Sequence, residues 1–258
     1  METSFDKAAL NYDATFTNSE IGQLQRNLIY KQLSNQLDSV QNILEINCGT
    51  GEDAIWFVQQ NFKITATDIS PKMIDVAKSK ANFDNLNFQT ADINSISTTF
   101  ANKKFDLVFS NFGGLNCLSK SDLEKFFQNV PSILSEKGKL VLVIMPKNTL
   151  WEQFYFLVKA QFSSTFRRKK ESVSAKVDGE NVPTYYYNPK DIVNLSVKNF
   201  TVVDQKPIGF FVPPSYLEPF FKNKKGILLF LNKLEKGVSS WSFLSKYADH
   251  FIITLQKR

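Results

Sequence analysis

The sequence has little of the chemistry that structural metal centres and disulfide-linked folds use. Among its 258 residues there are two cysteines, Cys48 and Cys117, and one histidine, His250. The cysteines do not form a Cys-x-x-Cys pair, and these three residues cannot supply an ordinary zinc site built from Cys and His. We therefore expect no metal, and the scarcity of cysteine favours a reducing, cytoplasmic setting.

Long hydrophobic runs are also missing. The longest apolar stretches, such as 140–145 and 227–231, are far shorter than the ~20 residues that a membrane-spanning helix needs. Residues 1–10 contain charged side chains and no apolar run of the kind found in secretory signals. We expect no membrane span, and the composition, 43% hydrophobic and 22% charged, is typical of a globular protein with a large core.

Charge is distributed unevenly along the chain. Residues 1–150 carry 14 Lys and Arg against 16 Asp and Glu, whereas residues 151–258 carry 17 against 9. This basic excess suits an acidic substrate, an anionic surface or a nucleic acid, but it suits a solvated surface without a partner equally well. The basic clusters at 167–170 and 222–225 are interpreted as solvated charge, with docking of an acidic carrier or anionic headgroup as the alternative.

Short apolar segments alternate with amphipathic ones from residue 42 onward. Five segments have the length and apolar content of buried strands: 42–46, 63–67, 86–90, 105–110 and 139–145. Helices are expected over 52–60, 72–81 and 122–134, with Pro71 at a favoured first-turn position and Ser121 as a cap. Strands that alternate with helices predict a parallel sheet covered on both faces, as in doubly wound α/β folds.

Residues outside this region are less regular. The first 40 residues predict a helical cap, because Ile21, Leu24, Leu28 and Leu33 form one apolar stripe. After Pro146 the expected elements are a helix over 151–166, a loop or hairpin over 167–183, a helix over 189–198, strands over 201–211 and 250–256, and an insertion over 213–247.

A glycine turn follows the first predicted strand. Residues 43–51 are Ile-Leu-Glu-Ile-Asn-Cys-Gly-Thr-Gly. Gly49 and Gly51 allow a tight turn in which a ligand approaches the backbone, and the next helix presents free N–H groups to a carboxylate or phosphate. Ligands of open α/β sheets bind at the carboxyl ends of the strands, so this turn predicts a nucleotide-type site.

Acidic residues follow the second and third predicted strands. Asp68 ends the second strand, where a carboxylate can accept hydrogen bonds from ribose hydroxyls, although it could instead cap the following helix. Asp92 and Ile93 follow the third strand, where a carboxylate and an apolar side chain can contact the amino edge and the face of an adenine. We therefore expect an adenosine-containing cofactor.

These segments together resemble the cofactor motifs of class I S-adenosylmethionine-dependent methyltransferases. The matching segments are 45–51, 68–73, 91–93, 105–111 and 133–142, and Tyr12-Asp13 resembles a short element that closes over the cofactor in many small-molecule members. The resemblance covers residues 5–145 and is loose beyond Pro146. It implies S-adenosyl-L-methionine as cofactor and a Rossmann-like doubly wound sheet, mostly parallel with an antiparallel last strand.

The same resemblance implies one methyltransferase domain over residues 1–258 and a role for each matched residue. Residues 1–40 would be the helical cap, 41–146 the cofactor-binding core, and 147–258 the substrate cover and last strands. Near the methionine end of the cofactor we expect the backbone around Glu45, Asn47 and Gly49, together with Asn111 and Phe112. Asp68 is expected at the ribose, and Ile69, Met73, Asp92 and Ile93 near the adenine. The implied cofactor-binding set is completed by Tyr12, Cys48 and Gly51.

Asn47 departs from the family pattern, which usually has glycine at this position. Asparagine tolerates a left-handed backbone, so the turn can form, and its side chain could contact the cofactor's carboxylate. Residues 49–54 also match the G-x-G-x-x-A pattern of NAD(P)-binding folds. Against that alternative, Glu45 just before the turn would face a pyrophosphate but suits a ligand that carries an amino group.

No residue stands out as a general base, and no catalytic residue is assigned. Methyl transfer from a sulfonium is an in-line displacement in which positioning can supply most of the acceleration, on the order of 7–11 kcal/mol. A protein base is optional and depends on the acceptor. His250 lies in the predicted last strand, and we interpret it as a structural residue.

The acceptor is expected to be a small-molecule or lipid-like compound, with an acidic acceptor left open. Residues 111–116 lack the Asn/Asp-Pro-Pro-Tyr/Phe motif of enzymes that methylate amino groups of nucleic acids, which argues against a nucleic-acid substrate. The segment after Pro146 is rich in aromatic residues, which are interpreted for the most part as packing in the core and the lid, with a lining for an organic acceptor as the alternative: Trp151, Phe154, Tyr155, Phe156, Phe162, Tyr185, Tyr186, Tyr187, Phe210, Phe211, Tyr216, Phe220 and Phe221. RNA methylation through the basic second half and a non-catalytic cofactor-binding scaffold remain as alternatives.

Overall fold

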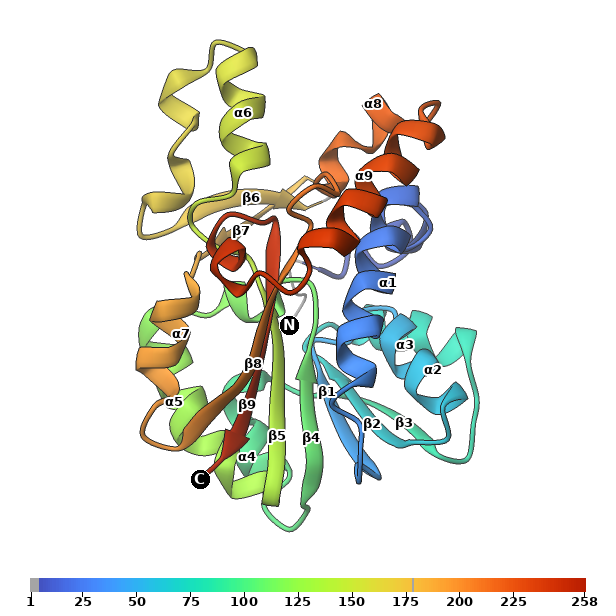
Figure 1. Ribbon diagram of the computed structural model, residues 1–258. Helices are drawn as coiled ribbons and strands as arrows, with labels where there is room; N and C mark the ends of the chain where they lie inside the picture. The colour runs from blue at the N-terminus through green and yellow to red at the C-terminus, as the bar shows by residue number, and fades with distance from the viewer. Residues whose placement is uncertain (1–4, 178) are drawn as a thin grey trace.

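A seven-stranded sheet forms the centre of the computed structural model, which describes residues 5–177 and 179–258 (Figure 1). The strands are β1 (Asn42–Ile46), β2 (Lys63–Asp68), β3 (Leu86–Thr90), β4 (Phe105–Ser110), β5 (Leu134–Ile144), β8 (Phe200–Ile208) and β9 (His250–Lys257). Their order is β3-β2-β1-β4-β5-β9-β8. Strand β9 runs antiparallel to both of its neighbours, and the first five strands are parallel. The predicted Rossmann-like sheet with an antiparallel last strand is confirmed.

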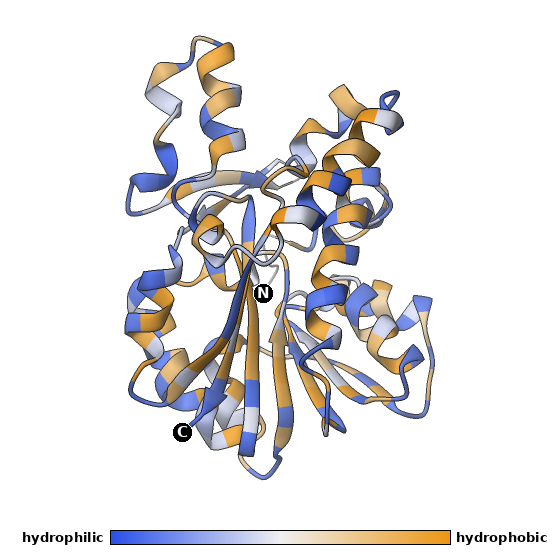
Figure 2. Ribbon diagram, in the orientation of Figure 1, coloured by the Kyte–Doolittle hydropathy of each residue, from blue (hydrophilic) through white to orange (hydrophobic). Residues whose placement is uncertain are grey.

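Helices cover both faces of this sheet (Figure 1). One face carries α1 (Glu20–Ser34), α2 (Glu52–Gln59) and α3 (Pro71–Lys80), and the other carries α4 (Ile96–Thr99), α5 (Lys120–Asn129) and α7 (Pro189–Ser196). Successive strand residues enter opposite cores, as in β4, where Leu107 and Phe109 pack on the α1 side and Val108 on the α5 side. This double burial explains why the central strands β4 and β5 are richer in apolar residues than the edge strand β3 (Figure 2).

Some predicted boundaries were wrong. Ser119, and not Ser121, caps α5, because its Oγ accepts the Asp122 N–H at 3.3 Å. The helix ends at Asn129 since Pro131 lacks the N–H that would bond the Phe127 carbonyl, which accepts from Asn199 Nδ2 at 3.0 Å instead. A short helical turn follows, and β5 begins at residue 134 rather than 139.

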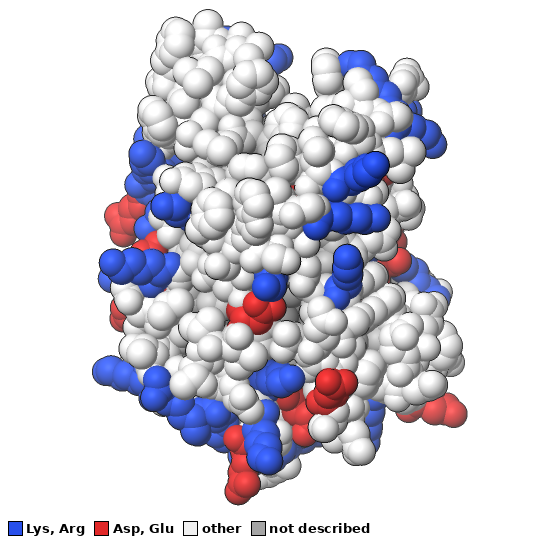
Figure 3. Space-filling model, viewed as in Figure 1, with Lys and Arg blue, Asp and Glu red and all other residues white. Residues whose placement is uncertain are grey.

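Two helical arms rise beyond the carboxyl edge of the sheet (Figure 1). The first arm, residues 150–170, contains α6 (Leu150–Val158), which ends earlier than the predicted helix over 151–166 and is followed by two short turns. The second arm, residues 213–247, contains α8 (Glu218–Phe221) and α9 (Lys225–Val238). Strands β6 (Val173–Val177) and β7 (Glu180–Thr184) form the predicted hairpin between the first arm and α7. Figure 3 shows the arms as two lobes with a notch between them.

Two carboxylates fasten the second arm to the core. Glu235 is 1% exposed and accepts the four consecutive N–H groups of residues 209–212 at 2.6 to 3.2 Å. Glu218 accepts the N–H groups of Glu20 and Ile21, at 3.0 and 2.9 Å, so it caps the amino end of α1. The second arm is therefore held in a defined position. None of the helices in the described residues is long and apolar enough to span a bilayer.

Candidate functional site

A cavity of about 270 Å³ opens where β1, β2, β3 and β4 end. Its wall comes from the turns that follow these strands and from the amino-terminal segment. The predicted cofactor-binding residues that line it are Tyr12, Asn47, Cys48, Gly49, Asp68, Ile69, Met73, Asp92, Ile93, Asn111 and Phe112. Thus the fold brings together residues from five separate segments of the sequence at one site.

Two members of the predicted set do not line this cavity, Glu45 and Gly51. Gly51 has φ 79°, and a Cβ there would lie 2.6 Å from the Phe88 ring, so the glycine is required by the turn and its packing. Glu45 is 1% exposed, and its Oε2 has no hydrogen-bond partner among the described residues. Burial raises its pKa well above the ordinary value, and the nearby charge of Asp53 adds to this effect.

Asn47 adopts the left-handed conformation that its position requires, with φ 59°. Its side chain packs against the backbone of Gly114, where an added Cβ would lie 2.6 Å from Asn47 Cβ. The Ser110 hydroxyl also lies 3.4 Å from Asn47 Oδ1, a long hydrogen bond. A glycine after β4 therefore accommodates the side chain that replaces the family's usual glycine after β1.

Asp68 links the glycine turn to the end of β2. Its two carboxylate oxygens accept the N–H groups of Gly49 and Ser70, each at 2.9 Å. Burial raises the pKa of Asp68, and these backbone hydrogen bonds partly oppose the shift. Asp68 does help to start α3, as the alternative interpretation held, but each oxygen keeps a second lone pair that a hydroxyl could use.

A polar network beneath the cavity was not predicted from the sequence. Arg26 in α1 forms a buried ion pair with Asp53 in α2, and Tyr30 donates to the same carboxylate at 2.7 Å. Asn111 Nδ2 donates to the other Asp53 oxygen at 2.9 Å, and the Arg26 guanidinium lies 4.8 Å from the centre of the Phe112 ring. The network fixes Asn111 and Phe112 at the end of β4. Both Arg26 and Asp53 also line the cavity.

The amino-terminal segment closes over the glycine turn. Asp13 accepts hydrogen bonds from the Thr50 hydroxyl at 2.6 Å and from Lys80 at 2.8 Å. Burial would raise the pKa of Asp13, but the Lys80 and Thr50 hydrogen bonds outweigh it and lower the pKa. Next to it, Tyr12 reaches to within 3.9 Å of the position that a Cβ on Gly49 would occupy, and burial raises its pKa to about 12.

A second cavity, of about 390 Å³, adjoins the first. Tyr12 and Phe112 line both cavities, so they form the wall between them. The remaining residues of the second cavity come from the amino-terminal segment, the residue after β5, both arms, β6, and the start of β9 with the residue before it: Ala8, Thr15, Phe16, Met145, Arg168, Lys176, Pro214, Ser215, Tyr216, Asp249 and His250. Of the predicted aromatic cover, only Tyr216 is among the described residues that line it; Tyr187, by contrast, is buried and donates to the Leu118 carbonyl at 2.7 Å.

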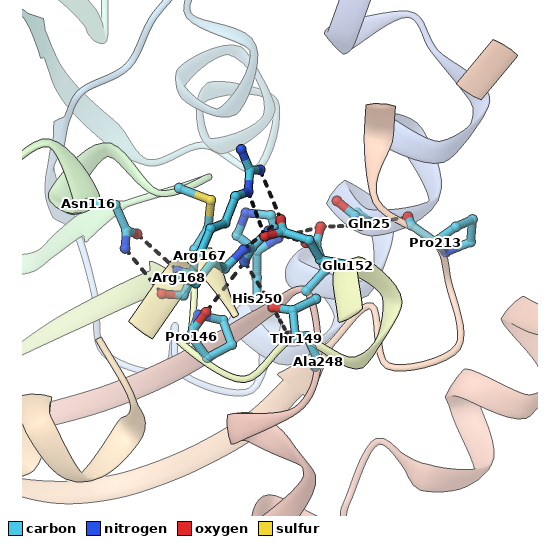
Figure 4. Close-up of polar contacts among 12 residues, drawn as sticks. Gln25, Asn116, Pro146, Thr149, Glu152, Arg167, Arg168, Pro213, Ala248 and His250 are labelled. Atoms are coloured by element: carbon cyan, nitrogen blue, oxygen red, sulfur yellow. Dashed lines mark hydrogen bonds and ion pairs between the residues drawn. The ribbon is translucent and has the colours of Figure 1, made fainter. Parts of the chain in front are cut away.

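Arg168 is buried beside this second cavity, so its interpretation as solvated charge was wrong. It is 5% exposed, its Nε donates to Glu152 at 2.9 Å, and its Nη1 donates to the Thr149 hydroxyl at 2.9 Å (Figure 4). Its Nη2 also lies 3.5 Å from Asp249 Oδ1. Glu152 accepts from Arg167 as well, at 2.9 Å. This cluster ties the first arm to the start of β9.

Comparison with known proteins agrees with the fold. The model of a methyltransferase domain matches residues 43–138. An uncharacterised protein of Methanocaldococcus jannaschii is 25% identical over 84% of this chain and 85% of its own length. A malonyl-[acyl-carrier protein] O-methyltransferase of Acetivibrio thermocellus is 32% identical over 78% of this chain, but the match spans 65% of that protein. A glycopeptide N-methyltransferase solved with S-adenosyl-L-homocysteine shares the fold, with a TM-score of 0.59 at 12% identity over 90% of this chain and 89% of its own.

These comparisons support a class I S-adenosylmethionine-dependent methyltransferase that uses S-adenosylmethionine as its methyl donor. The family resemblance inferred from the motifs is thereby confirmed. The NAD(P) alternative is not supported by these relatives.

Proposed function

We propose that the first cavity holds S-adenosylmethionine and that the second holds a small-molecule or lipid-like methyl acceptor. In this arrangement Asp68 accepts from the ribose, Ile69, Met73, Asp92 and Ile93 surround the adenine, and Asn47, Asn111 and Phe112 lie toward the methionine end. The cofactor supplies an activated methyl group on a sulfonium. The protein's own contribution is to hold the acceptor in line with that group and to exclude water.

The shared wall of Tyr12 and Phe112 carries this proposal. A methyl donor and its acceptor must approach from two connected spaces for an in-line displacement, and these cavities meet at two aromatic rings. Phe112 is fixed by its contact with Arg26 and by an edge-on contact with Phe16, with ring centres 4.8 Å apart. Rigid aromatic rings at the edge that the two cavities share can orient both molecules for direct contact.

The surface of the arms favours an acceptor with a long apolar part. Large apolar side chains are exposed on the first arm at Phe154, Leu157, Val158, Phe162 and Phe166, and on the second at Phe220, Ile227, Leu229 and Phe230. The arms touch at their bases, where the Tyr155 and Tyr216 ring centres are 5.5 Å apart. An apolar tail could lie along the notch between them while its polar end enters the second cavity.

A second candidate acceptor is an acyl group on a carrier protein. Relatives that are 29% and 32% identical are named malonyl-[acyl-carrier protein] O-methyltransferases, and lysines flank the apolar residues of both arms. A basic rim of this kind would suit an acidic carrier. The two cysteines are both free, which fits our proposal that the reaction takes place in the cytoplasm.

The test is transfer of a labelled methyl group from S-adenosylmethionine into a total cell extract, which is then separated into lipid, small-molecule, protein and RNA fractions. We expect label in the lipid or small-molecule fraction. Label in carrier protein would favour the second candidate, and label only in RNA would contradict both acceptor assignments.

One substitution tests the role of the arms. Phe162 is 69% exposed on the first arm, so Phe162→Ser should reduce labelling of long-chain acceptors while leaving S-adenosylhomocysteine binding unchanged. Phe83 provides the matched control, because it is a phenylalanine that is 43% exposed outside both arms. Equal loss in Phe162→Ser and Phe83→Ser would contradict a role of the arms in acceptor binding.

A further inference from the structure

The chain's single histidine lies on the wall of the second cavity. His250 is the first residue of β9 and is buried, with 7% exposure. Its ring meets the Phe112 ring edge-on, with centres 5.7 Å apart. Because Phe112 also lines the first cavity, only one aromatic ring separates the imidazole from the cofactor cavity. In the sequence His250 lies at a strand end far from the cofactor motifs, so its place beside the two cavities could not be predicted.

A carboxylate lies against one nitrogen of this ring. His250 Nδ1 is 3.2 Å from Asp249 Oδ2, although the N–H is not aligned for a linear hydrogen bond, so the contact is electrostatic. A negative charge beside Nδ1 favours the tautomer that carries its proton there. The other nitrogen, Nε2, then has a free lone pair, and the imidazolium that forms on protonation is stabilised.

Asp249 is itself held in place by charged and polar groups. Gln25 Nε2 donates to Oδ2 at 3.1 Å, and Arg168 Nη2 lies 3.5 Å from Oδ1. Burial would raise the pKa of Asp249, but His250 and Arg168 outweigh it and lower the pKa. Asp249 therefore stays ionised at neutral pH. Arg168 comes from the first arm and Gln25 from α1, and both are labelled in Figure 4.

The other ionisable groups of the cavity wall are less suited to accept a proton. They are Tyr12 from the amino-terminal segment, Arg168 from the first arm, Lys176 from β6, Tyr216 from the second arm and Asp249 itself. Burial raises the pKa of both tyrosines, so their hydroxyls are neutral near pH 7. The ammonium group of a lysine and the guanidinium of an arginine are donors without a lone pair to offer, and the Asp249 oxygens already face Gln25 and Arg168.

We propose that His250 is the general base of the methyl transfer, oriented by Asp249, and that the acceptor atom is a hydroxyl oxygen or an amine nitrogen. This inference rests on the second cavity being the acceptor site. The acceptor's lone pair forms the new bond to the methyl carbon, and the carbon–sulfur bond breaks with its electrons left on sulfur. The acceptor's proton passes to Nε2 of His250, and from the imidazolium to water. An acceptor carboxylate would not need this base, because it has no proton to lose.

A spectroscopic test follows from there being only one histidine in the chain. In a tag-free, ¹⁵N-labelled sample, the two imidazole nitrogens give a single set of signals that reports the tautomer. We expect the neutral ring to carry its proton on Nδ1, which leaves the lone pair of Nε2 free. A proton on Nε2 in the neutral ring would overturn the proposal.

Two substitutions distinguish the effect of Asp249 on the His250 ring from a general change in the folded structure. Asp249→Asn should shift the neutral ring toward a mixture of tautomers. Asp204→Asn is the matched control, because Asp204 on β8 pairs with Lys206 at 3.2 Å and does not line the cavity. Spectra of Asp249→Asn that match those of Asp204→Asn would show that Asp249 does not orient the ring.

Activity gives a second readout, on the product labelled in the extract assay. His250→Gln should lower kcat by on the order of 10²-fold or more, leave S-adenosylhomocysteine binding unchanged, and remove the fall in rate that the proposal predicts for the wild type as pH decreases. Unchanged kcat with a retained acidic limb would contradict the base. Absence of any labelled product from the wild type would instead count against the proposed function, while the spectra would still decide the state of His250.

Discussion

Replacing Gly114 with alanine should destabilise the chain, because the new methyl group would collide with Asn47. The added Cβ would lie 2.6 Å from Asn47 Cβ and 2.7 Å from Cγ. A rotamer change of Asn47 cannot relieve a contact with Cβ, so one of the two turns must shift. Overpacking of this kind costs roughly 1–3 kcal/mol, and each kcal/mol lowers the Tm of a chain this long by about 2–4 °C.

The second substitution of this test is Asn47→Gly, which removes the side chain that causes the collision. Glycine tolerates the left-handed φ of this position, so the single variant should stay close to the wild type in stability. In the Asn47→Gly background, Gly114→Ala should lose most of its cost, which corresponds to a coupling energy of about 1–2 kcal/mol.

The coupling energy is measured by urea unfolding of the wild type, the two single variants and the double variant. Titration of each protein with S-adenosylhomocysteine shows whether the double variant binds it as the wild type does. The same cost for Gly114→Ala in both backgrounds would refute the steric explanation. It would then follow that the glycine is needed for its own backbone and not for the side chain of Asn47.

Three further predictions concern carboxylates. Glu235→Gln should lower the free energy of unfolding by about 1–3 kcal/mol for each N–H of residues 209–212 that is left unpaired, and so lower the urea midpoint. An unchanged midpoint would contradict the role of Glu235 in holding the second arm. Because the folded-state pKa of Glu45 is raised, the folded chain binds a proton at Glu45 more readily than the unfolded chain does, and stability falls as pH rises above the ordinary pKa of a glutamate. Glu45→Gln should therefore show a smaller fall in Tm over this pH range than the wild type. An equal fall in both proteins would contradict the raised pKa of Glu45. Asp13→Asn should speed limited proteolysis near Tyr12, since Asp13 holds the amino-terminal segment to Thr50 and Lys80, and equal cleavage rates would show that these contacts do not hold it.

The sheet and most of the residues that line the first cavity could be predicted because local patterns determine them. Apolar strands of five to seven residues, the glycines after β1 and the acids after β2 and β3 each carry their information within a few positions. The tolerance of Asn47 for a left-handed backbone was likewise an intrinsic property of the residue, and φ 59° agrees with it. Most boundary errors were small, such as the cap at Ser119 instead of Ser121.

Long-range pairings could not be predicted in this way. Arg26 lies in a helix for which the sequence shows only an apolar stripe, and that stripe does not indicate a partner for the arginine. The partner of Arg26, Asp53, lies in the next helix. Arg168 lies in a run of four basic residues that is typical of a solvated surface, yet it is buried and forms ion pairs with Glu152 and Asp249. His250 gains its place on the cavity wall because β9 inserts between β5 and β8, which brings its amino end to the carboxyl edge of the sheet.

The most direct measurement for the cofactor site is calorimetric titration with S-adenosylhomocysteine of the wild type, Asp68→Ala and Asp106→Ala. Asp106 is the matched control: its Oδ2 accepts two backbone N–H groups, from Gln41 and Asn42, but it lies at the opposite end of the sheet. We expect one site on the wild type, no binding of NAD, affinity weakened by about 1–3 kcal/mol in Asp68→Ala, and unchanged affinity in Asp106→Ala. Tight binding of NAD, or equal affinity for S-adenosylhomocysteine in Asp68→Ala and the wild type, would contradict the placement of the cofactor in the first cavity.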